Sequence, residues 1–434
     1  MQTYGMNRRT LLVGGLISST SLLAACGGGS GAGPSEPIAV IPGPTPSPAP
    51  TPTPPPAISA GDAIKQRLRA AANSVQPVTL FGDGATIVVS LSSADTSPIQ
   101  GRRLVPWNDP AIRYVGRVQQ TRDAFPYNLT GTNRAVNYGA GGIFSNKYFA
   151  EFQTDARVFE IVYVGTGQPS ENRVLVNGRY VQFEAVRGGT DGNTYVSRVT
   201  LSSSELRNIR VETIAANLYG IYVGASDRVI APESSTTAPV RGLIIGDSYT
   251  EGASGIAGVS EFEVYAAQTA RSLGWRDFYQ SGVGATGYLA TRNGSLKFRD
   301  RLSTDVFPFQ PEVVVVAGGL NDPFEGLQSE AAATFDAIRA GLPDTPIFVV
   351  GPWTPFGDQS SKAAAIRAAV GSRGNFYYVD NADWLTGGGS VGRPTGQGNG
   401  DTWVGADGTH LTQIGHDGTS MRLVSAIKTV YASW

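Results

Sequence analysis

Residues 242–248, Gly-Leu-Ile-Ile-Gly-Asp-Ser, decide the fold of the C-terminal half of this 434-residue chain. The segment is a short apolar run that ends in a glycine and two polar residues, as expected for a buried strand followed by a tight turn. Helix-like stretches alternate with this run and later ones, which predicts a parallel sheet covered on both faces. Ligands of such sheets bind at the carboxyl ends of the strands. The later apolar runs are 312–317, 346–350 and 375–379, and the helix-like stretches are 261–273, 328–340, 360–370 and 413–431.

Strand-like patterns dominate the preceding region, 60–235, after a helix-like start at about 60–72. Residues 173–181 predict a hairpin, because Asn177-Gly178 supplies the positive φ angles of a tight primed turn. Short strands separated by turn residues predict an accessory β-sandwich or jelly-roll domain. The other alternating runs are 86–91, 149–163, 195–201 and 208–214.

The composition argues against several functions. There are 34 basic and 35 acidic residues, and this balance gives no field that would attract nucleic acid or an anionic membrane surface. The single cysteine, Cys26, rules out an intramolecular disulfide. We find no histidine, cysteine or carboxylate cluster with metal-ligand spacing, and no Walker-type or dinucleotide fingerprint. The sequence therefore predicts neither a metal nor a cofactor.

The first 26 residues resemble an export signal. Arg8 and Arg9 precede an apolar stretch over 11–25 that is too short and too polar to span a membrane. Residues 23–26, Leu-Ala-Ala-Cys, resemble a bacterial lipobox, in which Cys26 becomes the lipidated N-terminus; an ordinary signal peptide is the alternative. The Pro-rich linker over 27–59 favours an extended tether. We therefore expect an exported lipoprotein anchored to a membrane of the bacterial cell envelope.

A serine and a histidine are the candidate catalytic groups. Ser248 follows the first apolar strand, although aspartate and serine in such a turn are also common helix N-caps. A serine hydroxyl attacks poorly unless a base takes its proton, and the base needs an acceptor that fixes its tautomer. Asp407 lies three residues before His410 and can serve as that acceptor. The other histidine, His416, is expected to be a surface or helix-capping residue, so His410 is the candidate base.

Two further turns could bind an oxyanion. Asn321 follows the apolar run 312–317, and its amide could donate a hydrogen bond; a simple Gly-Asn-Asp turn is the alternative. Residues 281–287, Ser-Gly-Val-Gly-Ala-Thr-Gly, follow a strand expected to end near Gln280. Their backbone N–H groups could supply another donor, or the segment could be a flexible glycine-rich loop.

From about residue 240 onward, these four segments resemble, in their order, the SGNH or GDSL hydrolase family. The resemblance implies a three-layer α/β/α sandwich with a flavodoxin-like parallel sheet over 236–434. It also implies a serine esterase that forms an acyl-enzyme without a metal. In this family the matching serine is the nucleophile and the matching histidine the base, which gives these roles to Ser248 and His410, with Asp407 orienting the imidazole.

The resemblance also implies an oxyanion hole built from the Ser248 N–H, the Asn321 side chain and one amide of the glycine-rich segment. The family usually has glycine where the register here places Ala285, with Gly284 beside it. A backbone N–H can serve with any side chain if its φ angle is allowed, so either Gly284 or Ala285 remains the candidate donor. An acyltransferase using the same residues is an alternative function.

The ester itself is less clearly indicated. A β-rich module before an SGNH domain is similar to the arrangement in some carbohydrate esterases that remove acetyl groups, so we expect an acetylated glycan substrate. Four aromatic residues near the proposed active edge could stack on sugar rings or could simply pack the loops. The competing class is a glycan-binding envelope protein with an inert C-terminal domain. The four aromatic residues are Tyr249, Tyr288, Trp353 and Trp403.

Overall fold

The computed structural model divides the chain into two compact units, Met1–Pro56 and Ala57–Trp434. All of the described residues belong to the second unit, so the expected signal segment, most of the linker and Cys26 lie outside them. None of the helices that the structure describes is long and apolar enough to cross a membrane. The described residues are 58–92, 96–116, 118–121, 128–131, 147–165, 170–188, 193–214, 216–233, 239–252, 256–291, 295–355 and 357–434.

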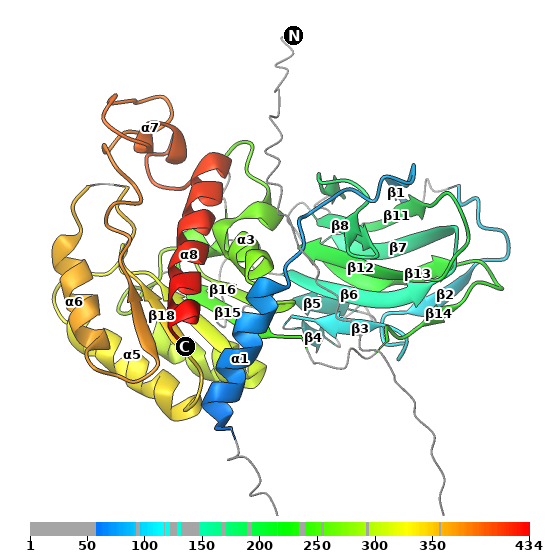
Figure 1. Cartoon of the computed structure of the whole chain (residues 1–434). Coiled ribbons are helices and arrows are strands. Elements are labelled where there is room, and N and C mark those ends of the chain that lie inside the picture. The colour runs from blue at the N-terminus through cyan, green and yellow to red at the C-terminus, as the bar shows by residue number, and fades with distance from the viewer. Residues whose placement is uncertain are drawn as a thin grey trace, which may run out of the picture. The chain divides into compact units, whose positions relative to one another are not determined.

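A five-stranded parallel sheet forms the centre of the C-terminal half (Figure 1). Its strand order is β16-β15-β17-β18-β19, which is 2-1-3-4-5 along the chain, the flavodoxin-like order. The prediction of a parallel α/β domain is therefore confirmed. The strands are β15 (Arg241–Gly246), β16 (Asp277–Gly282), β17 (Val313–Ala317), β18 (Ile347–Val350) and β19 (Phe376–Val379).

Helices cover both faces of this sheet. Successive side chains of a strand point to opposite faces, and because most of these strands are apolar along their length, both faces must be shielded from water. Ile244 and Val315 face a core shared with α1, α3 and α8, whereas Ile245 and Val316 face a core shared with α4, α5 and α6. The result is the expected three-layer sandwich. These helices are α1 (Ala60–Asn73), α3 (Tyr265–Ser272), α4 (Phe298–Arg301), α5 (Leu327–Gly341), α6 (Ser360–Val370) and α8 (Gln413–Ser433).

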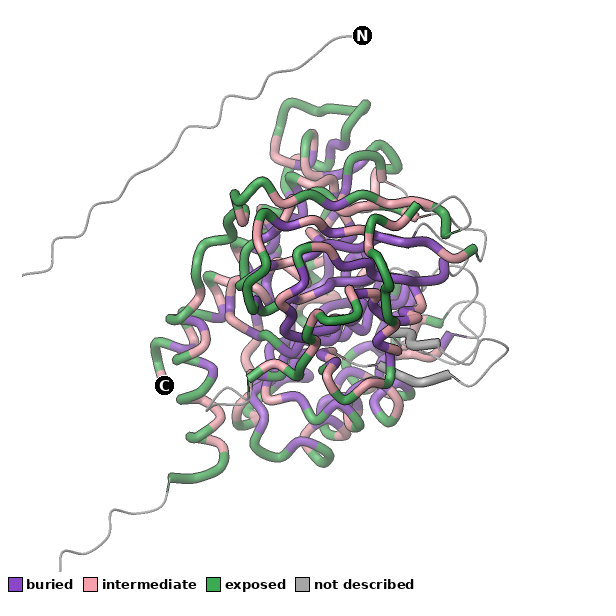
Figure 2. Tube along the Cα trace, turned by 90° about the vertical axis from the view of Figure 1, so that its right-hand side faces the viewer, coloured by how far each residue is buried: buried purple, intermediate pink, exposed green. Residues whose placement is uncertain are grey.

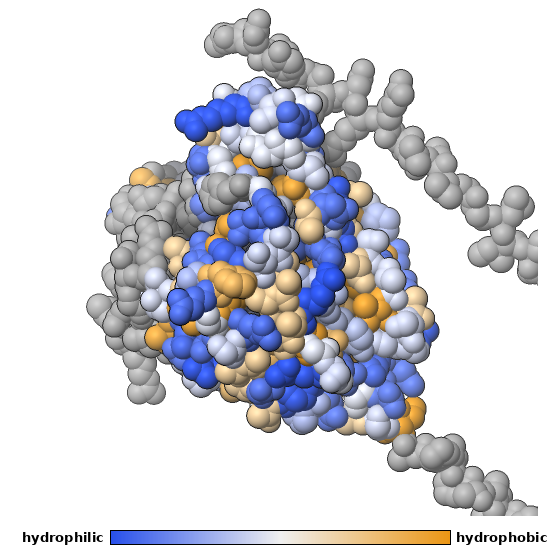
Figure 3. All heavy atoms as spheres, turned by 90° about the vertical axis from the view of Figure 1, so that its left-hand side faces the viewer, coloured by the Kyte–Doolittle hydropathy of each residue, from blue (hydrophilic) through white to orange (hydrophobic). Residues whose placement is uncertain are grey.

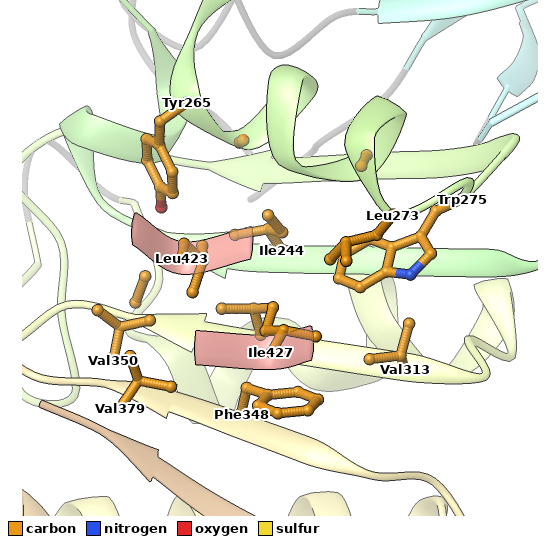
Figure 4. Close-up of a cluster of buried hydrophobic side chains, with 14 of the residues drawn as sticks. Ile244, Tyr265, Leu273, Trp275, Val313, Phe348, Val350, Val379, Leu423 and Ile427 are labelled. Atoms are coloured by element: carbon orange, nitrogen blue, oxygen red, sulfur yellow. The ribbon is translucent and has the colours of Figure 1, made fainter. Parts of the chain in front are cut away.

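The last helix, α8, packs its apolar side chains directly on the sheet. Figure 4 shows Leu423 and Ile427 of α8 beside Ile244 of β15 and beside Phe348 and Val350 of β18. All five side chains are fully buried. Burying a side chain of this size contributes about 1.5–3 kcal/mol, so this layer fixes the end of the chain, and with it the segment that precedes α8.

Helix α1 departs from the expected domain organisation, which grouped it with the β-rich region. Its buried residues, Leu68 and Ala72, belong instead to the core beneath α8. Arg69 also donates a 2.7 Å hydrogen bond to the backbone carbonyl of Trp434. The helix therefore packs with the end of the chain, because that is where its apolar stripe finds a partner.

The region before the parallel sheet forms two antiparallel sheets, which confirms the expected β-rich domain (Figure 1). One has the order β1-β11-β7-β13-β2 and the other β10-β8-β12-β6-β14, with β3 and β9 paired to the second. The first comprises β1 (Thr86–Leu91), β11 (Thr194–Thr200), β7 (Val158–Gly165), β13 (Ala216–Val223) and β2 (Arg103–Pro106). The second comprises β10 (Val186–Arg187), β8 (Glu171–Val176), β12 (Arg207–Ile214), β6 (Lys147–Thr154), β14 (Val229–Ile230), β3 (Arg113–Val115) and β9 (Arg179–Tyr180).

The two antiparallel sheets share one apolar core. Phe152 and Ile209 of one sheet and Phe159 and Ile221 of the other belong to it and are buried. Figure 2 shows the buried purple segments along the strands and the exposed green segments in the loops. The hairpin expected at Asn177-Gly178 joins β8 to β9, with positive φ angles of 50° and 79° at the two residues.

Shorter elements complete the fold. A two-stranded sheet pairs β4 with β5. On the side of the molecule that lies to the left in Figure 1, the surface is mostly hydrophilic, with hydrophobic residues scattered over it (Figure 3). The shorter elements are β4 (Val118–Thr121), β5 (Asn128–Gly131), α2 (Ser248–Glu251), η3 (Glu261–Glu263), η4 (Leu302–Val306), η5 (Phe307–Phe309) and α7 (Gly400–Trp403).

Candidate active site

Three adjacent strands of the parallel sheet end at the same level. Gly246, the last residue of β15, pairs with Gly282 at the end of β16 and with Ala317 at the end of β17. The segments that carry Ser248, Ala285 and Asn321 therefore leave the sheet side by side. The gap between β15 and β17 is also where the strand order reverses, the usual ligand position in such sheets.

The turn after β15 presents the Ser248 hydroxyl. Asp247 is the N-cap of α2, because its Oδ1 accepts the Tyr249 N–H at 3.0 Å, and Ser248 is the first helical residue. Ser248 is therefore not the cap, and the residue is partly exposed. The helix lies so close to β16 that a Cβ at Gly282 would fall 2.0 Å from the Glu251 nitrogen, so glycine is required there.

A fully buried carboxyl lies directly behind the proposed nucleophile. Within the described residues, Oδ2 of Asp247 has no hydrogen-bond partner. Burial raises the pKa of Asp247 to about 7, and the neighbouring Asp322 carboxylate adds to the rise. Near neutral pH this group therefore carries only part of a negative charge. Asp322 itself accepts the N–H groups of Tyr288, Leu289 and Ala290, and so anchors the end of the glycine-rich loop.

Asp407 and His410 form a tight pair in the loop before α8. Oδ2 of Asp407 lies 2.6 Å from His410 Nδ1, and its Oδ1 accepts the N–H groups of Thr409 and His410. Gly408 makes this turn possible with a φ of 74°. Desolvation opposes ionisation of Asp407, yet the Thr409 N–H and the His410 hydrogen bonds hold its pKa below the usual range. The carboxylate therefore holds a proton on Nδ1 and leaves Nε2 as the basic nitrogen.

Tyr249, the residue after Ser248, ties this loop to the turn after β15. Its hydroxyl donates to the backbone carbonyl of Thr409. Its ring stacks on Trp353 at a centroid distance of 4.8 Å and lies 6.0 Å from the His410 ring. Within the described residues no hydrogen bond joins the Ser248 hydroxyl to His410. Such bonds are often long in unliganded enzymes and tighten when the substrate binds.

The structure distinguishes the two candidate amides of the glycine-rich loop. The Gly284 N–H donates to Glu251 Oε2 at 2.6 Å. The next residue, Ala285, has a left-handed φ of 58°, and its N–H has no partner among the described residues. Asn321 Nδ2 donates one hydrogen to the Thr286 carbonyl at 3.1 Å, and its second hydrogen has no partner in the described part of the chain. We therefore favour Ala285 over Gly284 as the loop's oxyanion donor.

The predicted sugar-stacking aromatics are not exposed for that role. Tyr249, Tyr288 and Trp353 are buried, so the alternative interpretation, that they pack the loops, holds for all three. Trp403 is partly buried against the core beneath α8 and lies under the guanidinium of Arg422. These side chains are large apolar surfaces, and folding removes them from water. An aromatic residue that the sequence analysis did not single out, Phe324, is 60% exposed, three residues after Asn321.

His416 is not the surface residue that the sequence suggested. It is 1% exposed, its Nδ1 accepts the Tyr265 N–H at 3.2 Å, and its ring stacks on Tyr265. Burial, with the nearby Lys147 cation, lowers the pKa of His416 to about 3. It is therefore a neutral core residue, separate from the Asp407–His410 pair. The sequence pattern of α8 gave no signal that His416 would be buried.

Comparison with known proteins agrees with this geometry. Residues 244–417 match the sequence model of the GDSL-like lipase/acylhydrolase family. No curated protein sequence matches the chain. Within the described residues, no group of three or more His, Cys, Asp or Glu is placed to hold a metal ion.

Solved structures with a similar fold share little sequence with the chain. The salicylyl-acyltransferase SsfX3 from a tetracycline biosynthetic pathway is 17% identical, with a TM-score of 0.59 over 76% of this chain and 98% of that one. A family two carbohydrate esterase from Cellvibrio japonicus is 15% identical, with a TM-score of 0.55 over the same shares. One from Clostridium thermocellum in complex with cellohexaose is 18% identical, with a TM-score of 0.53 over 74% and 99%.

The buried His416 predicts a specific pH dependence of stability. The folded state binds a proton there only near pH 3, whereas an unfolded chain binds it near the ordinary histidine pKa. The contribution of the neutral His416 side chain to folding stability is thus fully present above about pH 6.5. It is lost as the pH falls below that value. In thermal unfolding, the wild type should lose stability relative to His416→Asn between about pH 8 and about pH 5. If the difference in thermal stability between the two proteins did not change with pH, His416 would not be the buried neutral histidine described here.

Proposed function

We propose that this chain, whose residues 244–417 form a GDSL-like lipase/acylhydrolase domain, is a serine esterase that removes O-acetyl groups from a glycan. One observation carries the proposal: the register of β15, β16 and β17 brings a serine hydroxyl, a free loop amide and an asparagine amide to one edge of the sheet. The Asp407–His410 pair is held to the same edge through Tyr249.

The reaction proceeds by two acyl transfers. His410 Nε2 takes the Ser248 proton as Oγ bonds to the ester carbonyl carbon, and the carbonyl electrons move to its oxygen. The tetrahedral intermediate collapses and expels the alcohol, which takes the proton from His410. Water then repeats the sequence on the acyl-enzyme and releases the acid. Asp407 stabilises the imidazolium in both steps.

The oxyanion is stabilised by the N–H groups of Ser248 and Ala285 and by the second amide hydrogen of Asn321. None of these three donors has another partner among the described residues. Losing one donor of this kind typically costs about 2.7–4 kcal/mol of transition-state stabilisation.

Two features support a carbohydrate ester. The site is open, since Asn321 is exposed and the Asp407 and His410 side chains keep 38% and 21% of their surface exposed, so a bulky polymer can approach. Phe324, three residues after Asn321 in the chain, offers an exposed aromatic ring on which a sugar could stack. The similar folds of two carbohydrate esterases fit this choice of substrate.

An acyltransferase is the second candidate. The acyltransferase with a similar fold motivates it, and the same residues would form the same acyl-enzyme. The difference lies in whether water or an acceptor hydroxyl attacks the acyl-enzyme. Because the site is open to solvent, we favour water.

We also propose that the protein is exported and anchored to a membrane of the cell envelope through Cys26. The apolar segment before Cys26, the preceding arginines and the proline-rich linker support this location. An envelope location would place the enzyme next to acetylated polysaccharides.

Replacing the nucleophile tests the proposed reaction. Ser248→Ala should abolish release of p-nitrophenol from p-nitrophenyl acetate and release of acetate from acetylated polysaccharides, with an unchanged thermal unfolding midpoint. Wild-type release from the glycans should exceed release from long-chain esters. Undiminished activity in Ser248→Ala would refute the nucleophile, and a preference for long-chain esters would refute the glycan. Product esters that form only when acceptor alcohols are added would favour the acyltransferase.

The lipid anchor is tested by cell fractionation. Cys26→Ser removes the only thiol that can be lipidated, so the protein should move from the membrane fraction to the soluble fraction. Continued sedimentation of the variant with membranes would count against lipidation at Cys26.

A further inference from the structure

A chain of buried hydrogen bonds links the β-rich domain to the turn that carries Ser248. It begins at Lys147, the first residue of β6, whose side chain is nearly fully buried. The Lys147 ammonium donates to Gln280 Oε1 on β16 at 3.2 Å and to the backbone carbonyl of Glu261. Burial lowers the pKa of Lys147 to about 8, so at neutral pH the side chain is still a cation and a donor.

Lys147 is one of three groups that fix which way the Gln280 amide faces. Gln280 Nε2 donates to the backbone carbonyls of Thr250 at 2.5 Å and Glu251 at 2.9 Å. With the amide turned round, its oxygen would face two carbonyl oxygens and its NH₂ group would face an ammonium. Buried polar groups that meet in this way lose their hydrogen bonds at a full desolvation cost. The ammonium at one end of the amide and the two carbonyls at the other therefore hold the amide in the orientation that binds α2.

The same hydrogen bonds reach both halves of the proposed site. Thr250 and Glu251 are the last residues of the one-turn helix that Ser248 begins. Glu251 Oε2 in turn accepts the N–H of Gly284, the residue before Ala285. A single helical turn is not stable by itself, so α2 needs support from outside, and Gln280 supplies it.

We propose that Lys147 and Gln280 are positioning residues that hold Ser248 and the Ala285 amide in place for attack on the ester. The β-rich domain is then part of the catalytic unit, because it supplies the cation on which this arrangement depends. The proposal rests on the serine-esterase function and is independent of which ester is cleaved.

The test uses the full chain and p-nitrophenyl acetate. Lys147→Met keeps the aliphatic stem and removes the donor, and should lower kcat roughly 10- to 100-fold, because small misplacements of reacting groups cost about that much. KM should stay within about twofold, since the lost contacts do not touch the substrate. Gln280→Leu should behave in the same way. The double variant should be no slower than the slower single variant, because both changes break one chain of contacts.

Arg210→Met is the matched control. Arg210 of β12 also reaches from the β-rich domain to the α/β domain, where it donates to the backbone carbonyl of Arg276 at 3.3 Å, without contacting α2. This variant should keep the wild-type kcat.

Three results would overturn the positioning role: a wild-type kcat in Lys147→Met, an equal loss in Arg210→Met, or additive losses in the double variant. If Lys147→Met does not fold, Gln280→Leu decides by the same criteria. Ser248→Ala separates this proposal from the esterase function. A wild type without Ser248-dependent hydrolysis rejects both, whereas an active wild type with a fully active Lys147→Met and Gln280→Leu rejects only the positioning role.

Discussion

The common end level of three parallel strands is the constraint on which the site depends. Gly246 pairs with Gly282 and with Ala317, and neighbouring strands lie about 4.8 Å apart, so the three segments that follow can share one carbonyl group. The alternating side chains of these strands fill two different cores, one on each face of the sheet. A slip of one residue would turn each set toward the wrong core, so the packing that stabilises the domain also fixes the geometry of the site.

Four buried polar side chains lie in the segments around the proposed nucleophile. Asp247, Glu251, Gln280 and Asp322 are all nearly inaccessible to water. All four accept or donate hydrogen bonds to the backbone that shape α2 and the glycine-rich loop. Leaving such groups unpaired is costly, so each bond restricts the loops to one arrangement. The site is thereby ordered before a substrate arrives, which is what preorganised stabilisation of an oxyanion requires.

The sequence was informative where local pattern and burial agree. The strand runs, the Asn177-Gly178 hairpin and the long last helix are all present in the structure, because each is specified within a few residues. The sequence pattern gave no correct prediction where a contact with a distant part of the chain determines which side chains are buried. It gave no means of knowing that α1 packs with the end of the chain or that His416 is buried. The aromatic residues near the active edge were as compatible with packing as with substrate binding, and Gln280 stood out in no local motif.

The most direct test of the account is to find which atom attacks. A fluorophosphonate reacts with an activated serine and remains attached to it, so mass spectrometry of the digested protein identifies the labelled residue. The account predicts one adduct, on the peptide that carries Ser248, and its loss in a folded His410→Ala variant. An adduct on another residue, or Ser248 labelling that does not depend on His410, would contradict it.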